Sequence, residues 1–153
     1  MTKKVARSRQ GSSTMKRILV GHDGSDEADA AFDSALNLAS LSGARVSAVS
    51  VATPPEPPTV VETEASLEAA TKHFEDIFEN LRRRATECGV DLDTRVLVGH
   101  PAEQILRVAS ELGVDLIVVG RRGRSGIRQW LFGSTSQRVI SHAPCSVLVV
   151  RGR

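Results

Sequence analysis

Four glycines and five arginines fall within one short stretch of the chain, GRRGRSGIRQWLFGSTSQRV at 120–139. Glycine is conformationally costly and is used where the backbone must turn sharply or be approached closely. Arginine side chains suit planar, multiply charged partners such as phosphate groups. Ser134, Thr135 and Ser136 add three hydroxyl groups directly after the last glycine of the stretch. These residue types in this spacing predict a phosphate-binding loop, with an ordinary solvent-exposed loop as the alternative.

The common nucleotide-binding motifs do not account for this loop. A Walker loop needs a lysine beside its glycines, and the only lysine beyond Lys16 is Lys72, which lies within a helical pattern. The segment GHDGSD at 21–26 also lacks the GxGxxG spacing of a dinucleotide fingerprint. Any phosphate groups must therefore be bound by backbone amides, hydroxyl groups and arginine side chains.

Apolar runs and helical patterns alternate from Arg17 onward, which is typical of an α/β protein with a parallel sheet. Strands are predicted at 18–20, 44–52, 91–98, 114–120 and 145–150. Four helices are predicted between them: one from Ser25 as its cap to Gly43, a long one that ends at 88–89, one at 100–113 with Pro101 in its first turn, and a short one capped by Ser134. The proline-rich segment at 53–59 is predicted to be a stiff surface connection.

The predicted sheet puts the glycine-rich stretch where ligands bind in such proteins. Gly120 ends the fourth strand, and Ser134 begins the last helix. In open α/β sheets, ligands lie outside the carboxyl ends of the strands, at the point where the strand order reverses. The N-terminus of a helix at that point offers free N–H groups and the positive end of its dipole to an anion.

The composition is that of one globular domain in a reducing compartment. The chain has 153 residues, 41% of them hydrophobic, which is enough for one domain with a core. No apolar run approaches the roughly 20 residues that a membrane span needs. The N-terminus has no apolar signal core, so a cytoplasmic location is predicted. Cys88 and Cys145 lack metal-ligand spacing, and both are predicted to be buried small side chains and not a disulfide.

The net charge of +2 comes from the first residues of the chain. Residues 1–14 contain four basic and no acidic side chains. Removing these four from the 20 basic side chains leaves 16 against 18 acidic ones in 15–153. A disordered basic leader at 1–14 and one folded domain at 15–153 are therefore predicted. Because that domain is slightly acidic, nucleic acid is not expected as a partner.

The remaining polar residues form no catalytic or metal-binding group along the sequence. His73, His100 and His142 have no cysteine or carboxylate partner at metal-ligand spacing, so no metal site is predicted. No nucleophile elbow or histidine–carboxylate pair can be identified from spacing, so no catalytic residue is predicted. Asp115 is predicted to cap or turn the chain into the fourth strand.

The glycine spacing and three flanking segments resemble one known family. Gly120-x2-Gly123-x9-Gly133-Ser134 resembles the G-2x-G-9x-G-S/T signature of the universal stress protein family. The flanking segments that match in the expected order are ILVGHDGS at 18–25, VGHPAEQIL at 98–106 and SHAPCSVLVV at 141–150. The resemblance covers 16–151, nearly everything except the basic leader.

This resemblance implies a single Rossmann-like α/β domain with a five-stranded parallel sheet in the order 3-2-1-4-5 and helices on both faces. It also implies ATP binding, in which Asp23 contacts adenine and ribose and the backbone of Val51 meets adenine. The glycine loop would surround the phosphates, Ser134 would donate to them, and Mg²⁺ would arrive only with the nucleotide. The site residues so implied are Gly21, His22, Asp23, Val51, Gly120, Arg121, Arg122, Gly123, Arg124, Gly126, Gly133, Ser134, Thr135 and Ser136.

Two departures from the family pattern bear on this site. His22 stands where the family usually has a small apolar residue, and Arg121-Arg122 replace a more typical Ser-His pair. The histidine is expected to narrow or polarise the adenine pocket, and the arginines are expected to strengthen phosphate contact. Asp23 has an alternative role as a turn-forming residue between strand and helix.

The sequence therefore predicts an ATP-binding universal stress protein, a dimeric cytoplasmic module whose nucleotide state alters its contacts. A slow ATPase and a nucleotide-free interaction scaffold remain as alternatives, and the downstream partner is unknown. The apolar last strand at 145–150 is expected to lie at an edge of the sheet and to pair with its own copy in a homodimer. Trp130, Leu131 and Phe132 are predicted to pack under the loop or at a subunit contact, with base stacking as the alternative.

Overall fold

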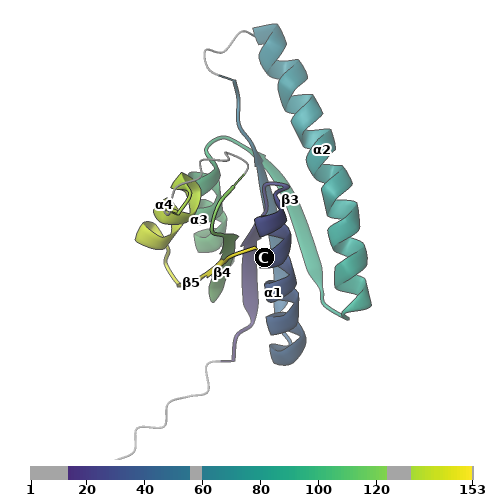
Figure 1. Ribbon diagram of the computed structural model, residues 1–153, viewed down its shortest axis with the longest axis vertical. Coiled ribbons are helices and arrows are strands. Elements are labelled where there is room, and N and C mark those ends of the chain that lie inside the picture. Colours follow the sequence, from purple (N-terminus) through teal and green to yellow (C-terminus); the bar gives the residue numbers. More distant parts are fainter. Residues whose placement is uncertain (1–13, 56–59, 124–131, 153) are drawn as a thin grey trace, which may run out of the picture.

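Strands and helices alternate along the chain (Figure 1). The computed structural model describes residues 14–55, 60–123 and 132–152. Its elements are β1 (Arg17–Gly21), α1 (Asp26–Ser42), β2 (Arg45–Ala52), α2 (Val60–Glu87), β3 (Leu92–Val98), α3 (Pro101–Leu112), β4 (Leu116–Gly120), α4 (Ser134–His142) and β5 (Ser146–Val150). Within this part of the chain, the predicted alternation of five strands and four helices is confirmed.

The strands form one parallel sheet in the order β3-β2-β1-β4-β5. The order implied by the family resemblance is therefore confirmed. Strand β1 lies between β2 and β4, and the register sets Gly21 opposite Val119. The strand order reverses between β1 and β4, so the segments that follow these two strands begin side by side.

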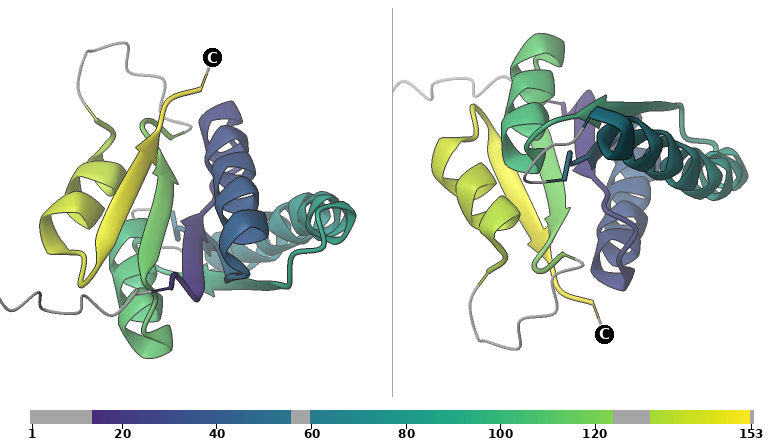
Figure 2. Two further views of the ribbon diagram at one scale, coloured as in Figure 1. Left: turned by 90° about the horizontal axis from the view of Figure 1, so that it is seen from below. Right: turned by 90° about the horizontal axis from the view of Figure 1, so that it is seen from above.

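Helices cover both faces of the sheet, with α1 and α2 on one face and α3 and α4 on the other (Figure 2). Successive residues of β1 point to opposite faces, as in any strand. Ile18 and Val20 lie in the apolar cluster with α1 and α2, whereas Leu19 lies in the cluster with α3 and α4. Because both of its faces are buried, β1 is a rigid base for the turn at its carboxyl end.

Helix α1 begins and ends where the sequence predicts. Ser25 is its N-cap, and the Ser25 hydroxyl oxygen accepts a hydrogen bond from the Ala28 N–H at 3.2 Å. Acidic side chains in the first turn complement the positive end of the helix dipole. Gly43 ends the helix in the left-handed conformation with φ of 73°. The cap holds the N-terminus of α1 directly beside the end of β1.

Two local predictions are wrong. Cys88 is exposed and not buried, because α2 ends at Glu87 and Cys88 follows its last turn, while Cys145 is half-buried. Ser134 is not the cap of α4 but its first helical residue, and Gly133 is the N-cap. The Gly133 N–H donates to the Arg121 carbonyl at 2.9 Å, which fixes the start of the helix one residue earlier than predicted.

Asp115 supports the fold at the start of β1. Its carboxylate accepts hydrogen bonds from the backbone N–H groups of Lys16 and Arg17 at 2.8 and 2.9 Å. These two hydrogen bonds hold the pKa of Asp115 below its usual value. Asp115 therefore ties the beginning of β4 to the beginning of β1, in agreement with the structural role predicted for it.

Several predictions concern residues outside the described part of the chain. They are residues 1–13 of the basic leader predicted at 1–14, and the residues Arg124, Gly126, Trp130 and Leu131. Phe132, the last of the apolar group at 130–132, is described and is half-exposed. Among the helices given above, none combines the length and the apolar character that crossing a membrane requires.

Candidate functional site

A cavity of about 160 Å³ opens at the carboxyl ends of β1 and β4, where the strand order reverses. Three segments that are far apart in the sequence meet there: 21–23, 120–123 and 133–136. The predicted site residues that line the cavity are Gly21, His22, Asp23, Val51, Gly120, Arg122, Gly123, Gly133, Ser134, Thr135 and Ser136. The sequence therefore identified the segments that the fold brings together.

Arg121 is not among the residues that line the cavity, and its guanidinium group lies 4.0 Å from a carboxylate oxygen of Glu27 in the first turn of α1. Its predicted contact with phosphate stays a prediction. Arg124 and Gly126, which were also predicted to bind phosphate, lie outside the described residues.

Five apolar residues line the cavity without having been predicted to do so. They are Ala28, Val49, Pro101, Ile105 and Val119, from α1, β2, α3 and β4. Along the sequence they fit the ordinary pattern of core positions, and only their closeness to the ends of elements could have singled them out. Together they give the cavity an apolar wall.

The turn between β1 and α1 presents the Asp23 carboxylate to the glycine loop. Oδ1 of Asp23 accepts hydrogen bonds from the Ser25 N–H at 3.0 Å and the Ser25 hydroxyl at 2.6 Å. Oδ2 lies only 2.5 Å from the position that a Cβ on Gly123 would occupy. Gly24 completes the turn with φ of 85°, in the left-handed region that favours glycine. Asp23 therefore has the turn-forming contacts and also faces the cavity.

Hydrogen bonds to Arg121 bring the two ends of the glycine loop together. The Arg121 carbonyl accepts from the Gly133 N–H and from the Ser136 hydroxyl, both at 2.9 Å. The Arg121 N–H donates to the Val150 carbonyl at the end of β5, at 2.7 Å. Ser136 is itself buried. The base of the loop is thus fixed to the last strand on one side and to α4 on the other.

Glu27 of α1 makes a contact with this loop that the sequence did not reveal. One of its carboxylate oxygens accepts a hydrogen bond from the Arg122 N–H. A Cβ on Gly120 would lie 2.9 Å from the Glu27 carbonyl carbon and 3.0 Å from its carbonyl oxygen. Gly120 is therefore required for the close approach of α1 to the end of β4, in addition to any contact with a ligand.

The N-terminus of α4 faces the cavity through 134–136. The first hydrogen bond along this helix runs from the Gln137 N–H to the Gly133 carbonyl at 3.0 Å. The N–H groups of the preceding helical residues have no acceptor within the helix, as at every helix start. These N–H groups and the positive end of the helix dipole suit a negatively charged ligand group.

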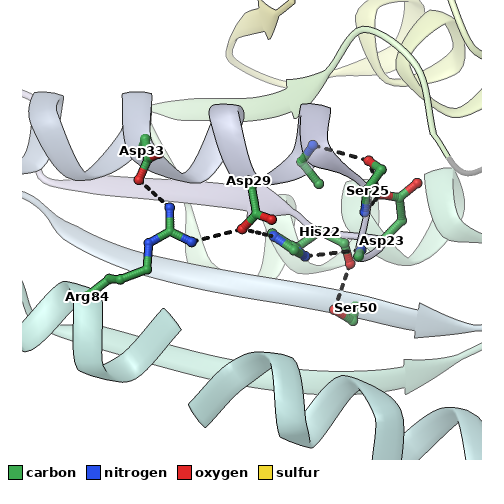
Figure 3. A network of polar contacts seen from close by, with 9 residues as sticks. His22, Asp23, Ser25, Asp29, Asp33, Ser50 and Arg84 are labelled. Carbon is green, nitrogen blue, oxygen red and sulfur yellow. Dashed lines mark hydrogen bonds and ion pairs between the residues drawn. The ribbon is translucent and has the colours of Figure 1, made fainter. Parts of the chain in front are cut away.

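The imidazole of His22 is directed at α1 (Figure 3). The residue is only 3% exposed, and its Nε2 lies 3.5 Å from Oδ1 of Asp29. The backbone N–H of His22 donates to the Val49 carbonyl at 2.9 Å, and the backbone carbonyl of His22 accepts from the Ser50 hydroxyl at 2.6 Å. Burial lowers the pKa of His22 below the usual histidine value. The ring therefore contacts the turn beside the cavity and faces helix α1, and His22 is also one of the residues that line the cavity.

The cavity offers two different environments to one ligand. The wall made by Val49, Val51, Ile105 and Val119 is apolar and suits a flat ring. Other parts of the lining come from Arg122, the glycines and the start of α4, which suit an anion. Among the described residues, no group of three or more histidine, cysteine or acidic side chains is placed to hold a metal ion.

The strand order and the position of this cavity define a doubly wound α/β protein with a cavity at the topological switch point. The model of the universal stress protein family matches residues 14–151. The chain therefore belongs to the universal stress protein family.

Relatives agree with this assignment over nearly the full chain. A protein of Staphylococcus haemolyticus named as a universal stress protein is 36% identical over 141 residues, which cover 90% of this chain and 86% of the relative. The solved universal stress protein UspA from Lactobacillus plantarum is 30% identical, with a TM-score of 0.85 and coverage of 91% of this chain and 99% of that one. A universal stress protein solved in complex with cAMP is 28% identical, with a TM-score of 0.72 and coverage of 92% and 100%.

Proposed function

We propose that this protein binds ATP in the cavity at the carboxyl ends of β1 and β4, and that the bound nucleotide alters its contacts in the cytoplasm. The observation that carries the proposal is the cavity itself, which is lined by an apolar wall and by the glycine loop and start of α4. A purine base fits the apolar wall, and phosphate groups fit backbone N–H groups and an arginine. The similar protein solved with cAMP supports an adenine nucleotide as the class of ligand.

In this proposal the nucleotide extends beyond the cavity. A volume of about 160 Å³ is below the roughly 300–1,000 Å³ of pockets that enclose most of a small ligand. The adenine would lie against Val51 and Ile105, and the Asp23 carboxylate would meet the ribose. The phosphates, with Mg²⁺ bound to them, would continue along Gly123 and Ser134.

The direct test is to denature the purified protein and to look for released adenine nucleotide by chromatography. Nucleotide-free protein would then be titrated with Mg-ATP in a calorimeter. We expect either a stoichiometric amount of released nucleotide or saturable binding of added Mg-ATP. If both are absent, the proposed function is rejected in favour of a nucleotide-free scaffold. Release of phosphate over many turnovers would instead identify an ATPase.

Replacement of Ser134 by alanine should weaken Mg-ATP binding by about 1 kcal/mol, the usual net contribution of one hydrogen bond. The hydroxyl lies in the first turn of α4 and lines the cavity. Ser141→Ala in the same helix is the matched control, because the Ser141 hydroxyl is exposed and donates to the Gln137 carbonyl. Calorimetric titration of both variants checks this. Equal affinities for the two variants would exclude Ser134 as a phosphate ligand.

We also propose that two copies associate through β5. Among the strands that the structure describes, only β4 pairs with β5, which therefore lies at an edge of the sheet. Its valine and leucine side chains are half-buried, and nearby Ile140 of α4 and Phe132 are 44% and 49% exposed. An apolar edge strand tends to pair with another strand, and pairing with a second copy gives a closed two-fold contact.

We therefore expect a dimer at micromolar concentration in light scattering, and Val149→Lys should make the protein monomeric. Val149 packs against the cluster with α3 and α4, so circular dichroism must show that the variant is folded. Leu41→Lys is the matched control, because Leu41 is a highly exposed apolar residue at the far end of α1. A wild-type protein that is monomeric would reject the proposed dimer. Dimers of the folded Val149 variant would exclude the β5 edge as the interface.

A further inference from the structure

The contacts of the His22 imidazole define which ring nitrogen carries hydrogen. Nδ1 accepts a hydrogen bond from the Gly24 N–H at 3.2 Å. Because a backbone N–H can only donate, Nδ1 must hold a lone pair, and the neutral ring has its hydrogen on Nε2. The backbone of His22 is fixed to β2 through Val49 and Ser50. Gly24 therefore depends on the ring for one hydrogen bond, while the ring itself stays in place.

The other ring nitrogen faces a carboxylate without a good hydrogen bond. Nε2 lies 3.5 Å from Oδ1 of Asp29, and it has no hydrogen-bond partner among the described residues. Solvent has almost no access to this ring. A protonated ring would gain an ion pair with Asp29 but would lose the bond from Gly24, because Nδ1 would then be a donor.

Asp29 is held in its position by helix α2 (Figure 3). Nη1 of Arg84 lies 2.8 Å from Oδ1 of Asp29, and the same guanidinium group pairs with Asp33 one turn further along α1. It also lies over the Phe32 ring, 5.1 Å from the ring centre. The carboxylate beside His22 is thus a fixed part of the contact between α1 and α2.

The charged and titratable groups that face His22 come from the turn, from α1 and from α2. They are Asp23, Asp29, Arg84 and, beside Gly24, His73, whose Nε2 lies 3.5 Å from the position of a Cβ on that glycine. Burial lowers the pKa of His22, and Arg84 acts in the same direction, whereas the two carboxylates raise it. Burial is the largest of these effects, so the pKa of His22 lies below the usual histidine value and the ring takes up a proton only at acid pH.

We propose that His22 is a proton-controlled latch of the β1–α1 turn. The neutral ring holds Gly24, and with it the adjacent Asp23, in the arrangement that faces the cavity. The protonated ring forms an ion pair with Asp29 and no longer accepts a hydrogen bond from the Gly24 N–H, so the turn is released. The consequence for ligand binding rests on the proposed nucleotide site: acid pH weakens binding of the nucleotide by releasing the turn that holds Asp23.

The coupling between protonation of His22 and nucleotide binding predicts how much the affinity should change with pH. If protonated His22 binds the nucleotide less well, then bound nucleotide must lower the pKa of His22 by a reciprocal amount. As the pH falls below the usual histidine range, down to the lowest pH at which the protein stays folded, the affinity for Mg-ATP should fall by roughly tenfold for each unit of that pKa change. A terminal phosphate itself titrates near pH 6, so the effect must be measured against a matched variant.

The matched variant is His22→Asn, which keeps an oxygen acceptor near the position of Nδ1 but cannot take up a proton. His73→Gln removes the second imidazole beside Gly24. Calorimetric titration with Mg-ATP across this pH range should show a steeper loss of affinity for the wild type and His73→Gln than for His22→Asn. The latch would be overturned if the affinity of wild type and His22→Asn depended equally on pH. It would also be overturned if His73→Gln removed the pH dependence that His22→Asn retained.

NMR of the nucleotide-free wild type tests the latch without any substitution or ligand. We expect His22 to carry its hydrogen on Nε2 at neutral pH, and the Gly24 and Ser25 amide signals to shift as the ring titrates. The proposal would be rejected if Nδ1 of His22 carried the hydrogen at neutral pH, or if the Gly24 and Ser25 amide signals did not shift as His22 titrates. If the amide signals follow His22 but Mg-ATP binds at no pH, the latch stands and the proposed nucleotide function fails.

Discussion

Mg-ATP at about a hundred times its dissociation constant should raise the free energy of unfolding by about 2.7 kcal/mol, and Gly123→Val should remove this gain. The reason is crowding against Asp23, because any Cβ on Gly123 would lie 2.5 Å from Oδ2 of that carboxylate. Asp23 cannot simply move aside, since its Oδ1 is bound by the N–H and hydroxyl of Ser25. Valine would therefore push the loop away from the turn and out of its place at the cavity.

Backbone strain does not contribute to this expectation. Gly123 is absent from the glycines of the described chain with positive φ, so its conformation is open to other residues. The effect of the substitution should therefore appear in ligand binding more than in the stability of the nucleotide-free protein.

The measurement is thermal unfolding of both proteins with and without Mg-ATP. Gly89→Ala is a useful control, because Gly89 has φ of 66° at the end of α2 with no atom within 4 Å of the added Cβ. This control should lower the baseline stability and keep the full gain from ATP. If ATP stabilises neither wild type nor Gly123→Val, or stabilises both equally, the glycine loop does not bind its phosphates.

Gly120→Ala should lower the free energy of unfolding by about 2 kcal/mol even without nucleotide. The new Cβ would meet the backbone of Glu27, at 2.9 Å from its carbonyl carbon. That backbone lies in the first turn of α1 and is fixed by the Ser25 cap, so it cannot yield without moving the whole helix. The Glu27 contact with the Arg122 N–H should be lost as well.

Gly21→Ala is the matched control for this second prediction, because Gly21 ends the neighbouring strand β1. Its Cβ would meet the tip of the Ile105 side chain at 2.8 Å, and a side-chain tip can rotate away. Urea denaturation should therefore show a smaller loss for Gly21→Ala than for Gly120→Ala. If Gly120→Ala is as stable as the wild type, the close approach of α1 is not a constraint on this position.

The elements and the segments of the site could be predicted because their signals are local. The helix cap at Ser25 and the helix end at Gly43 depend only on neighbouring residues, and both predictions are confirmed. The glycines and hydroxyls at 120–136 follow directly after a buried strand, and parallel strands end at the same edge of a sheet. Local pattern therefore sufficed to identify which segments meet at the cavity.

The contacts that complete the site could not be predicted because they join distant residues. Glu27 binds the N–H of Arg122, 95 residues further along the chain. The direction of the His22 ring depends on Asp29, which Arg84 of a different helix holds in place. Ile105 fits a core pattern within α3, and only the strand order reveals that it faces the cavity. Each of these contacts follows from tertiary packing and cannot be identified from the sequence around any one of the residues.

The joined ends of the glycine loop have a consequence for how such a protein can diverge. Arg121 is bound directly to Gly133 and Ser136, so the sheet and α4 are connected whatever chain lies between them. The entropy cost of closing a loop rises by only about 0.6 kcal/mol for each doubling of its length. A change in the length of the chain between these joined ends should therefore cost the fold little in loop-closure entropy.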